Sequence, residues 1–282
     1  MELEPPGIIP PDDDPVLGRD PVVEAIEQAV DAGRLEEAVA KAREALERGD
    51  GNRLDLLFIA GDALLELGRP AEAEECFRRV LQQDEHCPSS RCWLAMALYR
   101  QARFDEAWRE CERVLAADTP AIDAHVVHGL LLERAGRYDE AEDCFRAASE
   151  LDPLRFAAPV RLTRSDFDKE VQLAARRLPA EFRKHLEQVA IVVEDLPADE
   201  LLQGGGLDPD LLGLFDGVPL TEESSMAPED LRPSYIYLFQ RNLERTARHH
   251  GELVEQISVT LYHELAHYLG FEEDDMEGMG LD

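Results

Sequence analysis

The spacing of apolar, small and charged positions repeats over the first half of the chain. Stretches that begin at Leu67, Gln101 and Ala135 share the pattern Arg-x-x-Glu-Ala, and their starts lie 34 residues apart. A weaker copy begins at Ala32, 35 residues before the second. A period of this length is typical of paired antiparallel helices that stack on neighbouring pairs. The first half is therefore predicted to be an α-helical solenoid.

Two positions in each repeat are predicted to fill the seam between the paired helices. The first is alanine in every copy, at Ala38, Ala73, Ala107 and Ala141. The second lies one turn later, at Ala42, Phe77, Cys111 and Phe145. The first helix of each pair is expected to end at Gly33, Gly68, Ala102 and Gly136. Glycine suits such an end because it adopts the left-handed conformation without strain.

These residues resemble the tetratricopeptide repeat over residues 19–153, with three good copies and a weaker first one. The chain departs from the repeat pattern at a missing early tryptophan and at Cys111, where an aromatic residue is usual. The resemblance implies a concave surface that binds a peptide or protein segment. A scaffold or a dimerisation face is the alternative.

The composition changes on both sides of the repeats. Residues 1–18 are rich in proline and aspartate and are predicted to be disordered. Pro153 stands where the last repeat helix should stop, and residues 154–162 are expected to form a linker. Residues 163–282 are then predicted to form a second domain.

The second domain combines helical and strand patterns. A helix is predicted from Ser165 as the N-cap, and strands are predicted around residues 189–197 and 233–240. Residues 203–210 read as a flexible loop, and residues 211–220 as an apolar segment with a glycine turn. A small α+β domain is therefore expected.

A long helix is predicted at the end of this domain, from about Glu252 to Leu269. Its expected core stripe is Val254, Ile257, Leu261 and Leu265.

This helix carries the sequence HELAH, in which His263 and His267 are four residues apart and therefore share one face. Two imidazoles about 6 Å apart suit one metal ion. Glu264 lies beside the first histidine and could take a proton from water whose pKa a zinc ion lowers, which is the arrangement of HExxH peptidases. The alternative is a surface helix with two solvated histidines.

A catalytic zinc ion needs a third protein ligand. His249 and His250 lie 13 or 14 residues before His263, roughly 20 Å along a helix, which is too far. The acids after Gly270 are nearer, since glycine can turn the chain back. Glu273 occupies the third-ligand place of the metzincin pattern HExxHxxGxxH, and Asp274 is its neighbour.

The second domain also resembles the bacterial zincin-like, or minimal, metallopeptidases over about residues 163–282. The segments that carry this resemblance are VVEDLP, LLGLFDGVPLTE, YIYLFQRNLE and VTLYHELAHYLGFEEDDM. It implies metal ligands at His263 and His267, a general base at Glu264, and a third ligand at Glu273 or Asp274.

The same resemblance implies that the strand YIYLF borders the cleft and pairs with an extended substrate. Tyr235 and Tyr237 are expected to be core or edge aromatic residues, and stabilisation of the oxyanion by one of them is the alternative. Met276 and Met279 are interpreted as packing residues.

Charge and cysteine content narrow the choice of partners and compartment. The chain has 61 acidic against 29 basic residues, a net charge of −32, and such a surface repels nucleic acid and anionic lipid. No secretory signal or membrane-length apolar run is present, so we expect a cytoplasmic protein. The five cysteines form no close pair and are expected to be reduced thiols without metal.

Together these features predict a zinc metallopeptidase with one Zn²⁺ per chain, joined to repeats that recruit a protein substrate or regulator. The alternative function is a repeat-based adaptor whose zincin-like domain binds metal without working as a protease. Glu264 favours the enzyme, because a purely structural zinc site needs no base.

Overall fold

A computed structural model of the chain describes residues 20–116, 122–223 and 232–271. The predicted disordered segment, residues 1–18, lies outside them. The chain divides into two compact units, Met1–Val80 and Leu81–Asp282. No helix in the described ranges is both long and apolar enough to cross a membrane.

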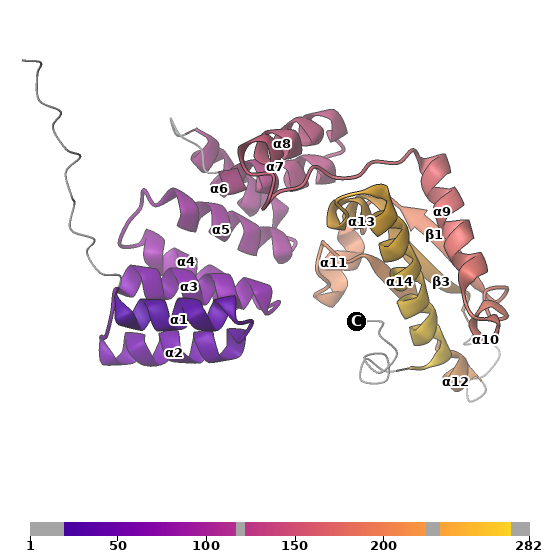
Figure 1. Ribbon diagram of the computed structural model, residues 1–282, viewed down its shortest axis with the longest axis horizontal. Coiled ribbons are helices and arrows are strands. Elements are labelled where there is room, and N and C mark those ends of the chain that lie inside the picture. The colour runs from indigo at the N-terminus through magenta and orange to yellow at the C-terminus, as the bar shows by residue number, and fades with distance from the viewer. Residues whose placement is uncertain (1–19, 117–121, 224–231, 272–282) are drawn as a thin grey trace, which may run out of the picture. The chain divides into compact units, whose positions relative to one another are not determined.

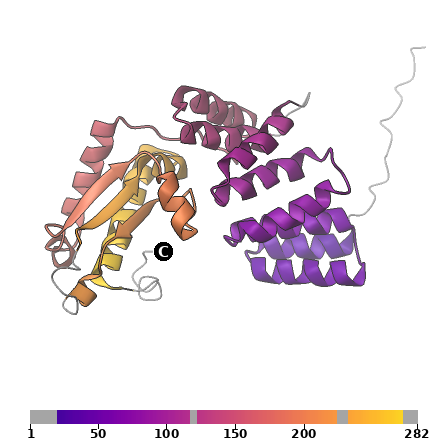
Figure 2. The ribbon, with the colours of Figure 1, turned by 180° about the vertical axis from the view of Figure 1, so that it is seen from behind.

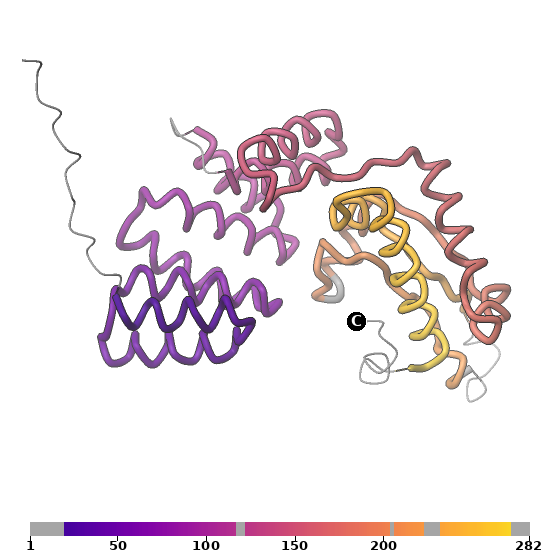
Figure 3. Tube along the Cα trace, viewed as in Figure 1, coloured from indigo at the N-terminus to yellow at the C-terminus, as the bar shows by residue number. Residues whose placement is uncertain are grey.

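The repeats form antiparallel helix pairs, one pair to each period (Figures 1 and 3). Their helices are α1 (Pro21–Asp31), α2 (Leu35–Arg48), α3 (Arg53–Glu66), α4 (Pro70–Leu81), α5 (Pro88–Arg100), α6 (Phe104–Leu115), α7 (Ile122–Arg134) and α8 (Tyr138–Leu151). The last helix ends two residues before Pro153, as predicted. The helical solenoid expected from the period is confirmed.

The seam positions are buried as the sequence predicts. The alanines at the first position are fully buried, and the residues one turn later are at most 5% exposed. Gly33, Gly68 and Gly136 have φ values between 67° and 71°, and Ala102 is held in the same left-handed region at 55°. Ala102 is therefore strained, since a Cβ atom makes this conformation unfavourable.

The smaller seam residue at Cys111 has a structural explanation. A methyl group added at Gly61 would meet the Phe77 ring at 2.7 Å, and one at Gly129 would meet the Phe145 ring at 2.6 Å. The 34-residue register places Ala95 at the corresponding position of the third repeat. An alanine there leaves no room for an aromatic ring, so Cys111 takes its place and is 1% exposed.

The C-terminal domain packs helices against one face of a three-stranded sheet. Its elements are α9 (Arg164–Arg177), α10 (Ala180–Arg183), β1 (Val189–Glu194), α11 (Asp199–Gly205), β2 (Gly213–Asp216), α12 (Leu220–Glu223), β3 (Ser234–Phe239), α13 (Gln240–Thr246) and α14 (His250–Leu269). The strand order is β1-β3-β2, with β1 parallel and β2 antiparallel to β3. The predicted α+β class is confirmed.

The core of this domain lies between the sheet and helices α9 and α14. Ile236 and Leu238 of β3 point into it and are fully buried. Phe167 of α9 and Ile257 and Leu261 of α14 cover them from the helical side. This packing fixes α14 against the sheet, and α14 carries the candidate site.

Three local predictions were wrong. Thr163 caps α9 in place of Ser165, because its hydroxyl accepts a hydrogen bond from the Asp166 N–H at 3.2 Å. The buried stripe of α14 begins at Leu253, which is fully buried, whereas Val254 is only half-buried. The predicted glycine-rich loop is partly helical, since α11 continues to Gly205.

Buried charges join the last repeat to the C-terminal domain within the unit Leu81–Asp282. The side chains of Glu133 in α7 and Glu244 in α13 are fully buried. Arg161 lies between them, 2.6 Å from a Glu133 oxygen and 3.0 Å from a Glu244 oxygen. Arg245 pairs with Glu133 and lies 2.9 Å from Asp210. Burial by itself would lower the pKa of Arg245, but the neighbouring groups Glu133, Tyr99 and Asp210 together outweigh it, and the net shift is upward.

Hydrogen bonds join the predicted linker to helix α13. The Val160 N–H donates to the Glu244 carbonyl at 3.1 Å, and the Leu162 N–H donates to the Glu244 carboxylate at 3.0 Å. The Gln240 amide donates to the Leu162 carbonyl at 3.0 Å. These hydrogen bonds hold residues 160–162, which directly precede the C-terminal domain, against α13 of that domain.

Candidate metal centre

Helix α14 positions the candidate ligands and ends where the sequence predicts. It begins two residues before the expected start, and the His249 ring accepts a hydrogen bond from the Glu252 N–H at 3.2 Å. Gly270 ends it with φ 86°, and a methyl group added there would lie 2.5 Å from the Thr221 hydroxyl. Glycine is therefore required at this turn.

His263 and His267 project from one face of α14 toward a common point. Their Nε2 atoms lie 3.1 Å apart, with the rings at 81° to each other and both side chains half-buried. Two imidazole nitrogens on one tetrahedral zinc ion, at about 2.0–2.1 Å from it, lie about 3.3 Å apart. The pair therefore fits a zinc ion.

The described residues do not supply a third metal ligand beside the two histidines. Among residues 20–116, 122–223 and 232–271, no group of three His, Cys, Asp or Glu side chains is placed to hold a metal ion. Glu273 and Asp274, the predicted third ligands, lie outside these ranges, as do Met276 and Met279. Their roles stay predictions.

Glu264 lies beside the two histidines and is held by the edge of the sheet. Its Oε2 atom accepts a hydrogen bond from the Phe215 N–H of β2 at 2.7 Å, and the residue is 7% exposed. A methyl group added at Gly213 would lie 2.7 Å from Thr260 Cγ2 and 2.8 Å from Glu264 Cγ. The absence of a side chain at Gly213 thus lets α14 approach β2 closely enough for this bond.

A cleft of about 540 Å³ opens over this arrangement. The two histidines and Glu264 line it together with Gly213, Leu214 and Phe215 of β2, and Pro219, Thr221 and Glu222 beyond that strand. Sequence reasoning missed the β2 contribution. The glycine within the apolar run LLGLF was the one sequence feature that could have indicated a close approach.

The prediction that β3 borders the cleft and pairs with the substrate was wrong. This strand lies between β1 and β2 and is paired on both sides, so it cannot add an extended substrate strand. Tyr235 and Tyr237 alternate with the core residues Ile236 and Leu238 and therefore lie on the sheet face opposite α14. They do not line the cleft with Glu264.

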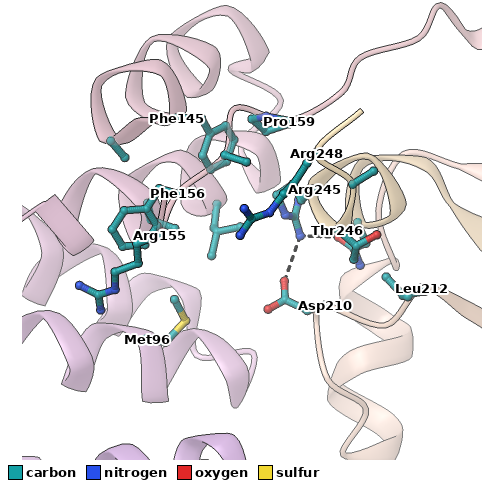
Figure 4. Close-up of a pocket in the computed structure, with 16 residues that line it drawn as sticks. Met96, Phe145, Arg155, Phe156, Pro159, Asp210, Leu212, Arg245, Thr246 and Arg248 are labelled. Carbon is teal, nitrogen blue, oxygen red and sulfur yellow. Dashed lines mark hydrogen bonds and ion pairs between the residues drawn. The ribbon is translucent and has the colours of Figure 1, made fainter. Parts of the chain in front are cut away.

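A second cavity, of about 430 Å³, lies between the last repeats and α13 (Figure 4). Met96 and Phe145 contribute apolar surface from the repeat helices, and Phe156 does so from the linker region. Arg245 and Arg248 reach it from the C-terminal domain. Asp210 lines the same cavity beside these arginines, and neither His263 nor His267 is among its described lining residues.

Known family models match both parts of the chain. A tetratricopeptide repeat model matches residues 25–88 and 60–122, and a second matches residues 122–153. A zincin-like metallopeptidase model matches residues 186–281, which include His263, Glu264 and His267. The chain joins tetratricopeptide repeats to a zincin-like metallopeptidase domain. Both predicted resemblances are thus confirmed.

Solved structures resemble part of the chain. A crystal structure of MamA is 20% identical over 45% of this chain and 74% of its own, with a TM-score of 0.39. YrrB, described as a TPR protein with an unusual peptide-binding site, is 23% identical over 47% and 68%, with a TM-score of 0.40. MamA from Desulfovibrio magneticus RS-1 is 19% identical over 54% and 80%, with a TM-score of 0.40. None of the curated proteins compared with the chain matches it.

Proposed function

We propose that this chain is a zinc-dependent metallopeptidase whose repeats bind a protein substrate or regulator. The observation that carries the proposal is the placement of three side chains in one open cleft. His263 and His267 direct their Nε2 atoms to one point, 3.1 Å apart, and Glu264 is anchored beside them by β2. Glu273, or its neighbour Asp274, would complete the ligand set for one Zn²⁺ per chain.

Each residue of the cleft has its own proposed role in peptide hydrolysis. His263 and His267 would hold the metal ion through their imidazole nitrogens. A zinc ion bound there supplies a Lewis acid that polarises a peptide carbonyl and favours deprotonation of water. The Glu264 carboxylate takes up the proton and returns it to the leaving amine. The Phe215 N–H fixes the orientation of that carboxylate through a charge-assisted hydrogen bond.

The edge of β2 is the surface on which we propose that the substrate lies. Among the described strands, β2 is at one edge of the sheet, and Gly213, Leu214 and Phe215 border the cleft. An extended peptide can add to such an edge through main-chain hydrogen bonds. The scissile bond would then lie over the histidine pair.

The repeats are proposed to recruit the protein that the zincin-like domain acts on. In this proposal residues 19–153 are the binding part, residues 154–162 the linker and residues 163–282 the catalytic part, in the cytoplasm. The cavity bordered by Met96, Phe145 and Arg248 is the site at which an apolar and acidic segment would bind nearest to the catalytic part.

Metal content tests the proposal. Protein purified in zinc-containing buffer should carry about one zinc ion per chain by mass spectrometry, and His263→Ala should lose it because two ligands do not hold zinc tightly. His250→Ala is the matched control, since its side chain lies in the first turn of the same helix and is 56% exposed. It should keep the metal.

Hydrolysis of an unstructured peptide mixture should stop with a chelator and return with added zinc. Wild-type protein that is free of metal after this purification would contradict the proposed site. A zinc-loaded protein that cleaves neither the mixture nor a protein captured by its own repeats would favour the adaptor.

A further inference from the structure

The sheet of the zincin-like domain has a second face, away from α9 and α14. Tyr235, Tyr237 and Phe239 of β3 alternate with the buried Ile236 and Leu238 and so project from this face. Figure 2 views the domain from behind, so that the strands lie in front of α14. Helix α11 lies at one end of the sheet. Tyr235 and Tyr237 are partly exposed, although both carry large aromatic rings.

The three rings form a continuous row along β3. The centroids of Tyr235 and Tyr237 are 6.1 Å apart, and those of Tyr237 and Phe239 are 6.4 Å apart with the planes within 6° of parallel. Beside the row lies a cavity of about 540 Å³, lined by Tyr237 and Phe239 and, from the α11 side, by Leu196 and Leu201. The aromatic row thus forms one wall of a hollow that has room for a side chain.

The border of this hollow is acidic. Glu194 at the end of β1, Glu200 in α11 and Asp216 at the end of β2 line the same cavity. Arg232 lies 3.8 Å from Asp216, and both side chains are about half exposed or more. Within the described ranges, no lysine or arginine pairs with Glu194 or Glu200. Burial, followed by the charges of Asp216, Tyr235 and Glu194, raises the pKa of Tyr237.

We propose that this aromatic face, defined by Tyr235, Tyr237, Glu194, Glu200 and Asp216, binds a lysine- or arginine-bearing segment of a protein partner. A cation gains from the face of an aromatic ring and from the carboxylates beside it. Two of the three acids have no cationic partner in the described structure, and their charge would repel a phosphate backbone or an acidic peptide. The hollow lies on the far side of the sheet from the histidine pair, so the inference does not depend on peptidase activity.

Calorimetry on the full chain can test this surface, with EDTA present so that hydrolysis does not contribute. The probe is a capped peptide of alternating glycine and arginine, and its citrulline analogue keeps the shape without the charge. The arginine peptide should bind and the citrulline peptide should not. Tyr237→Ser should weaken binding about three- to tenfold, which is the range of a partly desolvated cation–π contact.

Matched variants distinguish binding at this site from non-specific attraction of a cationic peptide to an acidic protein. Glu194→Gln should also weaken binding, and Tyr237→Phe should retain it because the ring remains. Asp139→Asn removes an exposed carboxylate in α8 and should leave binding unchanged. Equal losses from Asp139→Asn and Glu194→Gln, equal binding of the citrulline peptide, or full binding by Tyr237→Ser would each overturn the proposal. Should Tyr237→Ser fail to fold, Glu194→Gln against Asp139→Asn decides.

Discussion

Replacing Glu264 by glutamine is expected to reduce peptide hydrolysis by roughly 10² to 10⁴, the usual contribution of general acid–base catalysis. Glutamine has nearly the same size, and its carbonyl oxygen can still accept the hydrogen bond from the Phe215 N–H. The base is lost, but the anchor to β2 is kept. Zinc content and thermal stability should therefore stay near those of the wild type.

The rate is measured on an unstructured peptide mixture by mass spectrometry, with zinc content and melting temperature determined on the same samples. Glu255→Gln is the matched control, because Glu255 lies exposed on the same helix, away from the cleft residues. It should cleave at the wild-type rate. Equal cleavage by wild type and Glu264→Gln would show that any activity comes from elsewhere.

Removing the buried charge at Glu133 is expected to destabilise the unit Leu81–Asp282 by about 3–5 kcal/mol, the usual cost of breaking a buried ion pair on one side. The Glu133 side chain is fully buried and pairs with Arg161 and Arg245 at once. Glu133→Ala removes the negative charge that both guanidinium groups share. Water has little access to this site and cannot replace that charge. The repeat end and the zincin-like domain should then separate more readily.

Tryptophan fluorescence during urea unfolding reports this change selectively. Both tryptophans, Trp93 and Trp108, lie in the unit Leu81–Asp282. Glu140→Ala is the matched control, because Glu140 is 58% exposed and pairs with Arg137 at the surface. It should leave the unfolding midpoint close to that of the wild type, because solvent screens an exposed ion pair. Similar midpoint shifts for the two variants would show that the buried cluster does not hold this unit together.

The parts of the fold that sequence predicts are those set by local periodicity. The 34-residue period, the seam alanines and the end of α14 at Gly270 follow from spacing along one chain segment. Ala102 was expected where other repeats hold glycine, and it adopts the left-handed conformation that the position demands. His263 and His267 converge because four residues make about one helical turn.

The parts that sequence did not predict depend on pairing between distant segments. The strand order β1-β3-β2 puts β3 at the centre of the sheet, and no residue of YIYLF indicates that. The contact between Glu264 and the Phe215 N–H joins residues 49 positions apart. The sequence did give an indication at Glu133. This residue takes the repeat position of Leu65 and Tyr99, which are buried in the second and third repeats.

A crystal structure of the zinc-loaded chain, with diffraction recorded on both sides of the zinc absorption edge, tests the central claim most directly. We predict one anomalous peak within about 2.0–2.1 Å of the Nε2 atoms of His263 and His267, with a carboxylate oxygen of Glu273 as the third ligand. A peak bound by Asp274 in its place would reassign that ligand and leave the site intact. A zinc-soaked crystal with no peak between the two histidines, or with its zinc elsewhere, would contradict the account.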